Sequence, residues 1–327
     1  MNMTEPVHFM PAPTSMPRVP LRGEQRIDVP MAKHVSWRAG GRADRIYIPA
    51  DLEDFAAFVQ ATPASEPLLV VGLGSNLLVR DGGFRGTVVL LHGVLSTVDL
   101  QPEADGGTAT RVRFDAGVAC PKVARFAAMH GLECAEFLAG IPGTMGGALA
   151  MNAGCYGSQT WDRVMVATML TREGRLVECT SGDFDLGYRH VELRQPAAGG
   201  TSHVLGQDAW FVGATLQLDA GDAVRSRARI KDLLSRRIAT QPLQQPNAGS
   251  VFRNPPGDHA ARLIESCGLK GLSIGGAEVS LKHANFIVNR GGATASDIEA
   301  LVEAVRQRVL QQAGVDLVPE VRIVGDA

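Results

Sequence analysis

Two glycine-rich loops are the feature of this sequence that most constrains its fold. The first, Gly72-Leu-Gly-Ser-Asn76, follows an apolar run at Leu68–Val71 that has the pattern of a buried strand. The second, Gly140-Ile-Pro-Gly-Thr-Met-Gly-Gly147, precedes Ala148–Asn152. Glycine lets backbone N–H groups approach a diphosphate closely, because no Cβ intervenes and a positive φ costs little. Either loop alone would more often be a tight turn, but two of them some 70 residues apart would suit one extended cofactor.

The first loop does not have the sequence of the two best-known nucleotide-binding turns. Leu77 stands where a dinucleotide fingerprint needs its third glycine, and Leu77 to Arg80 continues as a strand rather than opening a helix. Neither loop carries the lysine of a P-loop. A dinucleotide would therefore bind here in another kind of fold.

Segments of strand and helix type alternate along the chain without an internal repeat, which indicates an α+β fold. A strand-rich body extends to about Asp219, and a smaller α/β unit follows it. We expect Ser296 and Glu299 to form a capping box ahead of a long helix, and a last strand around Pro319–Val321. The other expected strands are 45–49, 68–71, 87–91, 111–115, 164–170 and 210–218, and the other helices follow Asp51, run from Pro121 to Gly131, and span 223–238.

Composition excludes several classes of protein. The 327 residues carry a net charge of -2, which does not favour nucleic acid as a partner. The five cysteines contain no CxxC pair and the eight histidines lack metal-ligand spacing, so neither a disulfide framework nor a metal site is predicted. No apolar run approaches the roughly 20 residues that span a bilayer, and the proline-rich start is unlike a signal peptide. We expect a cytoplasmic protein without membrane insertion, and a monomer.

Three polar positions stand among turn-forming or apolar neighbours: Arg189, Ser250 and Glu320. Each has an ordinary structural explanation, as a turn residue, a strand-start cap and an exposed strand residue, respectively. Glu320 fits its explanation least well, because a carboxylate in a short apolar run is costly unless it has a partner. Arg189 could supply that partner from a distant part of the chain.

Taken together, these motifs resemble one enzyme family. Both glycine loops, Tyr188-Arg189, Ala248-Gly-Ser-Val-Phe-Arg-Asn-Pro255 and Pro319-Glu-Val321 occur in the order found in the UDP-N-acetylenolpyruvoylglucosamine reductases. The resemblance extends from about Trp37 to Ile323. It implies an FAD-binding fold of the vanillyl-alcohol oxidase (PCMH) type with a smaller α/β substrate-binding domain. It also implies non-covalent FAD, NADPH as co-substrate, and reduction of UDP-N-acetylglucosamine enolpyruvate to UDP-N-acetylmuramate in peptidoglycan precursor synthesis.

The resemblance also assigns roles to residues. Arg189 would meet the negative charge that develops on the substrate, Glu320 would polarise the substrate carboxylate as a proton donor, and Ser250 would protonate the α-carbon. The cofactor would lie against Gly72, Gly74, Ser75, Asn76, Gly140, Ile141, Pro142, Gly143, Gly146 and Gly147. The substrate would contact Tyr188, Arg236, Arg237, Arg253 and Asn254.

The implied domains are a flexible leader at 1–21, an FAD-binding domain at 22–219 and a substrate-binding domain at 220–316. The FAD-binding domain would have two subdomains and be completed by the C-terminal strand at 317–327. Residues 241–243, 275–280 and 282–286 resemble the shorter subtype, which lacks a tyrosine-bearing loop. Arg253 departs from a common lysine and Val191 from a frequent serine. Two alternatives stay open: a flavin oxidase or dehydrogenase acting on another substrate, and a non-catalytic protein that binds nucleotide sugars.

Overall fold

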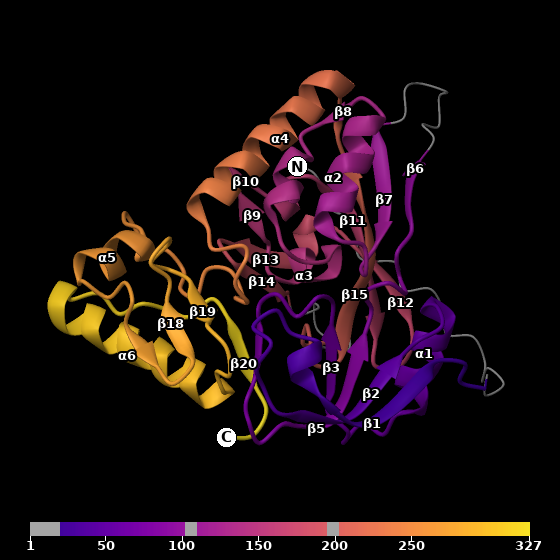
Figure 1. Ribbon diagram of the computed structural model, residues 1–327. Helices are drawn as coiled ribbons and strands as arrows, with labels where there is room; N and C mark the ends of the chain where they lie inside the picture. Colours follow the sequence, from indigo (N-terminus) through magenta and orange to yellow (C-terminus); the bar gives the residue numbers. More distant parts are fainter. Residues whose placement is uncertain (1–19, 102–109, 195–202) are drawn as a thin grey trace.

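The computed structural model describes residues 20–101, 110–194 and 203–327. The predicted leader, residues 1–21, lies almost wholly outside the described residues. The described part consists of a body built on two sheets and a smaller C-terminal unit, which Figure 1 shows on the left. Within it, no helix is both long and apolar enough to cross a membrane.

Parallel strands form the centre of the first sheet, whose order is β1-β2-β5-β3 with β1 antiparallel at its edge. Its elements are β1 (Glu24–Pro30), β2 (Arg42–Ile48), β3 (Leu68–Val71), β5 (Phe84–Leu90) and the adjoining helix α1 (Leu52–Ala61). Asp51 caps α1 as predicted, since its carboxylate accepts a hydrogen bond from the Asp54 N–H. Phe55 and Phe58 of α1 share a core with Trp210 of the second sheet, and this core joins the two halves of the body.

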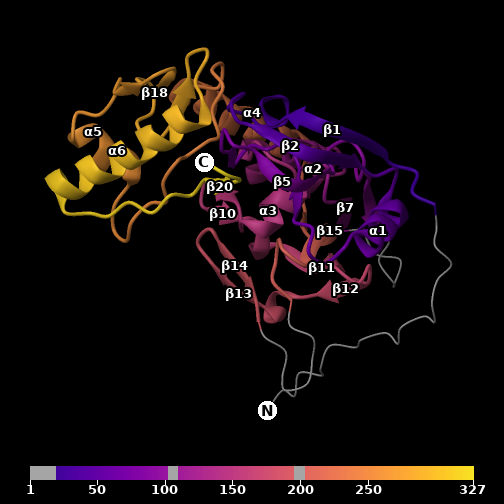
Figure 2. The same ribbon diagram turned by 90° about the horizontal axis from the view of Figure 1, so that it is seen from below.

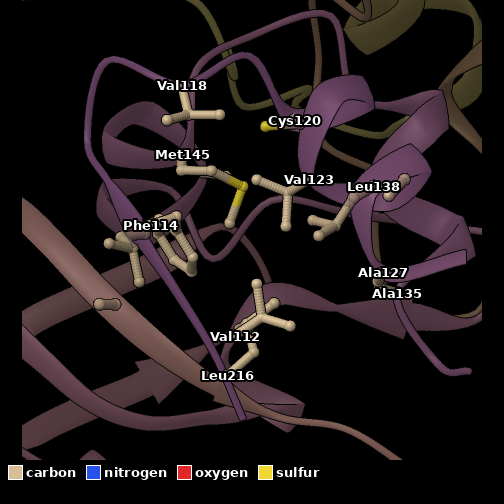
Figure 3. Close-up of a cluster of buried hydrophobic side chains, with 14 of the residues drawn as sticks. Val112, Phe114, Val118, Cys120, Val123, Ala127, Ala135, Leu138, Met145 and Leu216 are labelled. Atoms are coloured by element: carbon tan, nitrogen blue, oxygen red, sulfur yellow. The ribbon is translucent and has the colours of Figure 1, made fainter. Parts of the chain in front are cut away.

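The second sheet is antiparallel, with the order β12-β11-β15-β7-β6. Its strands are β6 (Val98–Gln101), β7 (Arg111–Asp115), β11 (Val164–Thr171), β12 (Leu176–Cys179) and β15 (Ala209–Gln217). Three helices pack with it: α2 (Cys120–Met129), α3 (Met145–Ala150) and α4 (Ala223–Thr240). Figure 3 shows Phe114 of β7 and Leu216 of β15 on one side of this core, with Val123 of α2 and Met145 of α3 on the other. Apolar alternation along the strands and helical spacing in α2 thus build one layer of helices on one sheet.

The C-terminal unit has a core of its own, but the body contributes to it. Its elements are α5 (Ala260–Ser266), α6 (Ala295–Ala313), β17 (Ser273–Ile274), β18 (Ala277–Val279) and β19 (Ile287–Asn289). Trp37 and Leu78, both from the body, are buried in this core. The chain then returns to the body, as Figures 1 and 2 show. There β20 (Arg322–Val324) pairs in parallel with β4 (Leu77–Val79).

Short elements connect these parts. The strands are β8 (Leu132–Glu133), β9 (Gly154–Cys155), β10 (Ser158–Gln159), β13 (Phe184–Gly187), β14 (His190–Leu193) and β16 (Asp219–Ala220). Single 3-10 turns occur at Met31–Lys33, Glu136–Gly140, Thr160–Asp162 and Ser181–Asp183.

The capping box predicted for α6 is wrong. Thr294 caps this helix and exchanges hydrogen bonds with Asp297. Ser296 and Glu299 instead bind the body: the Ser296 N–H and hydroxyl both donate to Asp81, and Arg80 donates to Glu299. The residues that looked like a cap therefore attach α6 to the turn after β4.

The predicted last strand also needs correction, and the packing of α4 bears on where the second unit begins. The last strand begins at Arg322 rather than around Pro319, because Pro319 forms only an isolated bridge to Phe252. Helix α4, which the prediction placed in the second unit, packs on α2, and its Ile230 lies in the core of the second sheet. Packing therefore changes near Pro242, after α4, rather than near Asp219.

Candidate active site

A cavity of about 630 Å³ is lined by both halves of the body and by the C-terminal unit. Its size falls within the usual range of small-molecule sites. Three groups of predicted residues border it: both glycine loops, the three polar positions singled out from the sequence, and two of the five expected substrate contacts. In the loops these are Gly72, Gly74, Ser75, Asn76, Gly140, Ile141, Pro142, Gly143, Gly146 and Gly147.

The two glycine loops lie against each other, although some 70 residues separate them in the sequence. A Cβ on Gly72 would overlap the Thr144 hydroxyl, and a Cβ on Gly143 would lie 3.1 Å from Ser75 Oγ. Gly74 has a φ of 61°, and a side chain there would strike the His34 carbonyl. Glycine at positions 72 and 143 allows the two loops to meet and form one side of the cavity, and glycine at position 74 lets the first loop pass close to His34. The result is a cradle of the kind that an extended dinucleotide needs.

Arg189 and Glu320 form an ion pair at the cavity, 131 residues apart in sequence, with Arg189 Nε donating to Glu320 Oε1 at 2.6 Å. Arg189 stands in the two-residue turn of the β13–β14 hairpin and has a φ of 56°, which non-glycine residues rarely adopt. Its guanidinium also donates to the Gly154 carbonyl at 2.8 Å and to the Asn152 carbonyl at 3.4 Å. Both side chains are largely buried, with 17% and 13% exposed. The guanidinium is therefore held in one orientation.

Burial raises the pKa of Glu320 above its ordinary value, while Arg189 and Arg253 oppose that shift. The backbone of Glu320 is fixed as well, since its N–H donates to the Val251 carbonyl at 2.7 Å. Asn76 of the first glycine loop donates from Nδ2 to the Glu320 carbonyl at 3.1 Å. The expected cofactor loop thus contacts the backbone of the residue that carries the expected catalytic carboxylate.

Ser250 borders the same cavity on a segment that is held from both sides. Asn285 Oδ1 accepts from the Phe252 N–H at 2.9 Å, and Asn285 Nδ2 donates to the Phe252 carbonyl at 2.8 Å. Gly249 precedes the serine with a φ of 76°, so the chain turns there without strain. The structure therefore brings Arg189, Ser250 and Glu320 to the border of one cavity.

The expected substrate residues divide into two groups. Arg237 and Arg253 border the cavity. Burial lowers the pKa of Arg237, and its Nε donates to Gln241 Oε1 at 2.8 Å. The Nε of Arg253 is buried and lacks a hydrogen-bond partner among the described residues.

Tyr188, Arg236 and Asn254 do not border the cavity. Arg236 is exposed on α4, while Asn254 accepts from the Ala260 N–H with its Oδ1 at 3.1 Å. Sequence reasoning did not single out Asn152 and Gly154, which hold Arg189. Their position directly after the second glycine loop was the available signal.

Across the described ranges, no group of three or more His, Cys, Asp or Glu side chains could hold a metal ion.

Comparisons with known proteins agree with this geometry. Residues 43–180 match the family described as FAD binding domain, and residues 241–324 match the family described as UDP-N-acetylenolpyruvoylglucosamine reductase, C-terminal domain. The UDP-N-acetylenolpyruvoylglucosamine reductase of Nitrosospira multiformis is 57% identical over 314 residues, which cover 93% of this chain and 90% of that protein. Its counterpart from Thiobacillus denitrificans is 56% identical over 313 residues, covering 94% of each.

A solved structure has the same fold. The crystal structure of UDP-N-acetylenolpyruvylglucosamine reductase (MurB) from Thermus caldophilus matches with a TM-score of 0.73 at 30% identity. The match covers 92% of this chain and 98% of that one. It confirms the predicted α+β fold, with an FAD-binding domain and a smaller second domain. The chain therefore belongs to the UDP-N-acetylenolpyruvoylglucosamine reductase family.

Proposed function

We propose that this protein reduces UDP-N-acetylglucosamine enolpyruvate to UDP-N-acetylmuramate, with bound FAD as cofactor and NADPH as reductant, in peptidoglycan precursor synthesis. The observation that carries the proposal is the cavity where two glycine loops, a buried Arg189–Glu320 pair and Ser250 come together. The relatives named above, which span nearly the whole chain, support the same activity.

The glycine loops at 72–76 and 140–147 would hold FAD. The loops border the cavity, and side chains larger than hydrogen at Gly72 or Gly143 would crowd the opposite loop. The chemistry that FAD supplies when bound is the transfer of reducing equivalents from NADPH to the enolpyruvyl double bond. The protein's own residues orient the substrate and stabilise the charge that develops on it.

Arg189 is suited to bind the substrate carboxylate, where negative charge increases during reduction. A guanidinium carries five N–H donors, of which three meet Glu320, Asn152 and Gly154. The remaining two can bind a carboxylate without any change in the orientation of the side chain. Glu320, whose pKa burial raises, can hold a proton beside that carboxylate and donate a hydrogen bond to it.

Ser250 is the proposed proton donor to the α-carbon. A serine hydroxyl is a very weak acid, but a carbanion next to a carboxylate is a strong base and can take its proton. Arg237 and Arg253 would bind the diphosphate or carboxylate from the cavity wall. We also propose that Tyr188, Arg236 and Asn254 contact the substrate, although they do not border the cavity.

The assignment to the shorter subtype is supported by residues 241–243, 275–280 and 282–286. We propose an FAD-binding domain from residue 22, completed by the C-terminal strand at 317–327. The packing of α4 favours extending that domain from residue 219 to about Pro242.

Because one chain supplies the lining of the cavity, we infer that a monomer is sufficient for activity. We also infer that the protein acts in the cytoplasm, where NADPH and nucleotide sugars are available.

Anaerobic stopped-flow spectroscopy tests the proposal by separating the two halves of turnover. NADPH should bleach the flavin absorbance, and the enol ether should restore it. In Ser250→Ala we expect normal bleaching and restoration that is about 10²–10⁴-fold slower. Ser266→Ala is the matched control, because that hydroxyl binds a carbonyl within α5, away from the cavity. A wild-type protein that NADPH bleaches but the enol ether does not restore would overturn the substrate assignment and favour a flavin oxidase.

A further inference from the structure

Asn152 is a wholly buried polar residue next to the Arg189 hairpin. It follows α3, the helix that continues the second glycine loop, and its φ of 42° is a left-handed conformation. Asparagine adopts this conformation more readily than most residues. A polar side chain with no exposed surface is retained only where its hydrogen bonds are made.

The Asn152 amide bridges two segments that are distant in sequence. Its Nδ2 donates to the Gly187 carbonyl at 3.1 Å, and its Oδ1 accepts from the Trp161 N–H at 3.1 Å. Gly187 is the last residue of β13 and directly precedes the turn formed by Tyr188 and Arg189. The side chain therefore ties the base of this turn to the end of α3.

The backbone of the same residue contacts the guanidinium itself. Arg189 Nη1 donates to the Asn152 carbonyl at 3.4 Å, and Nη2 donates to Gly154 two residues later at 2.8 Å. One short segment thus holds Arg189 at both ends, at its backbone through Gly187 and at its guanidinium through two carbonyls. Among the residues that the structure describes, the strands of this hairpin pair only with each other, so no larger sheet fixes its tip.

We propose that Asn152 is a positioning residue for the reduction of the enol ether, acting through Arg189. The inference rests on the proposed function. Asn152 links the loop expected to hold the cofactor with the cation expected to hold the substrate carboxylate. Its hydrogen bond to Gly187 fixes the distance between them, and a displacement of about 1 Å at such a site can cost about 10²-fold in rate.

Asn152→Gly tests this role with the backbone preserved. Glycine accepts the positive φ and keeps the carbonyl that binds Arg189, while both side-chain hydrogen bonds disappear. We expect the enol-ether step to slow by roughly 10–10²-fold with little change in KM, and the bleaching by NADPH to stay at the wild-type rate. If the glycine variant does not fold, Asn152→Asp keeps the size and the acceptor for Trp161 but, when ionised, cannot donate to Gly187.

Asn289→Gly is the matched control for a loss of stability alone. Asn289 is also buried, its Nδ2 donates to the Trp37 carbonyl at 2.9 Å, and its Oδ1 accepts from the Gly291 N–H at 2.8 Å. It does not border the large cavity. We expect this variant to unfold at lower denaturant concentration and to keep both half-reaction rates.

A double-mutant cycle decides whether Asn152 acts through Arg189. Introduced into Arg189→Ala, the Asn152→Gly change should slow the enol-ether step no further, because the group that it positions is gone. Losses that multiply, or an Asn152→Gly variant that slows both half-reactions equally, would overturn the inference, since a purely structural role gives those results. If the enol ether fails to restore the wild-type flavin, the proposed function fails and the inference fails with it.

Discussion

At the residue scale, the Arg189–Glu320 pair shows how two costly features compensate each other. A buried carboxylate alone would be expelled or neutralised, and a largely buried guanidinium needs acceptors. Here each is the other's partner at 2.6 Å, and backbone carbonyls satisfy further donors of Arg189. The pair therefore keeps a charged or proton-sharing group in a largely buried position.

The raised pKa of Glu320 predicts a specific dependence of stability on pH. Above the ordinary value of 4.5 and up to the raised value, the folded protein binds more protons at Glu320 than the unfolded chain does. Its free energy of unfolding must then fall as the pH rises through that window. Glu320→Gln cannot titrate, so the free energy of wild type minus that of the variant should decrease as the pH rises from 4.5. Urea denaturation of both proteins across this range measures the difference. A difference that grows with pH would show that attraction by Arg189 outweighs burial.

Most of the residues that the sequence predicted for this site border the cavity, and the reason is chemical. Glycines that need a close approach, and a glutamate in an apolar run, are recognisable without coordinates. Asn152 was not recognisable, because its importance depends on Gly187 and Trp161, which are near it only in the fold. For the same reason the sequence could not show that Tyr188, Arg236 and Asn254 stand beside the cavity rather than on it.

At the element scale, the local pattern of apolar residues was enough to predict strands, but the local sequence did not predict where the last helix begins. The expected strands at 68–71 and 111–115 have those bounds in the structure, because continuous apolar or alternating runs specify them. The start of α6 was misplaced by two residues, since Thr294 and Asp297 offer the same chemistry as Ser296 and Glu299. Only the position of Asp81 and Arg80 decides which pair caps the helix.

The contact between the two glycine loops gives a prediction for a pair of alanine substitutions. In Gly72→Ala the new Cβ would push against the Thr144 hydroxyl, whereas in Gly147→Ala the nearest atom lies 4.0 Å away. Neither glycine has a positive φ, so backbone strain does not differ between the two. We expect Gly72→Ala to lower both the thermal midpoint of the apoprotein and its affinity for FAD.

Gly147→Ala should weaken FAD binding without lowering the midpoint of the apoprotein, if this loop holds the cofactor. Calorimetric titration with FAD and thermal unfolding of the apoprotein measure the two quantities separately. Equal loss of midpoint in both variants would argue against loop contact as the cause. Undiminished FAD affinity in both would remove these loops from the cofactor site.

At the scale of the whole molecule, the C-terminal unit is tied to the body by more than the chain. Trp37 is fully buried in the core of that unit, its Nε1 donates to the Ile287 carbonyl at 2.8 Å, and its own carbonyl accepts from Asn289. The β4–β20 pairing and the attachment of α6 to Asp81 add to this connection. A cavity whose lining comes from both parts keeps its shape only if they stay together.

This connection predicts that the two parts unfold as one. Trp37→Phe removes the donor to the Ile287 carbonyl and should lower the free energy of unfolding by about 1–3 kcal/mol, the cost of an unpaired buried acceptor. Trp161→Phe is the counterpart within the body, since its Nε1 donates to the Leu149 carbonyl at 2.9 Å. In both variants, release of flavin and loss of far-ultraviolet circular dichroism should shift together to lower urea. If the units were independent, Trp37→Phe would leave flavin release unchanged and add a separate early transition, because only the C-terminal core would have lost a contact.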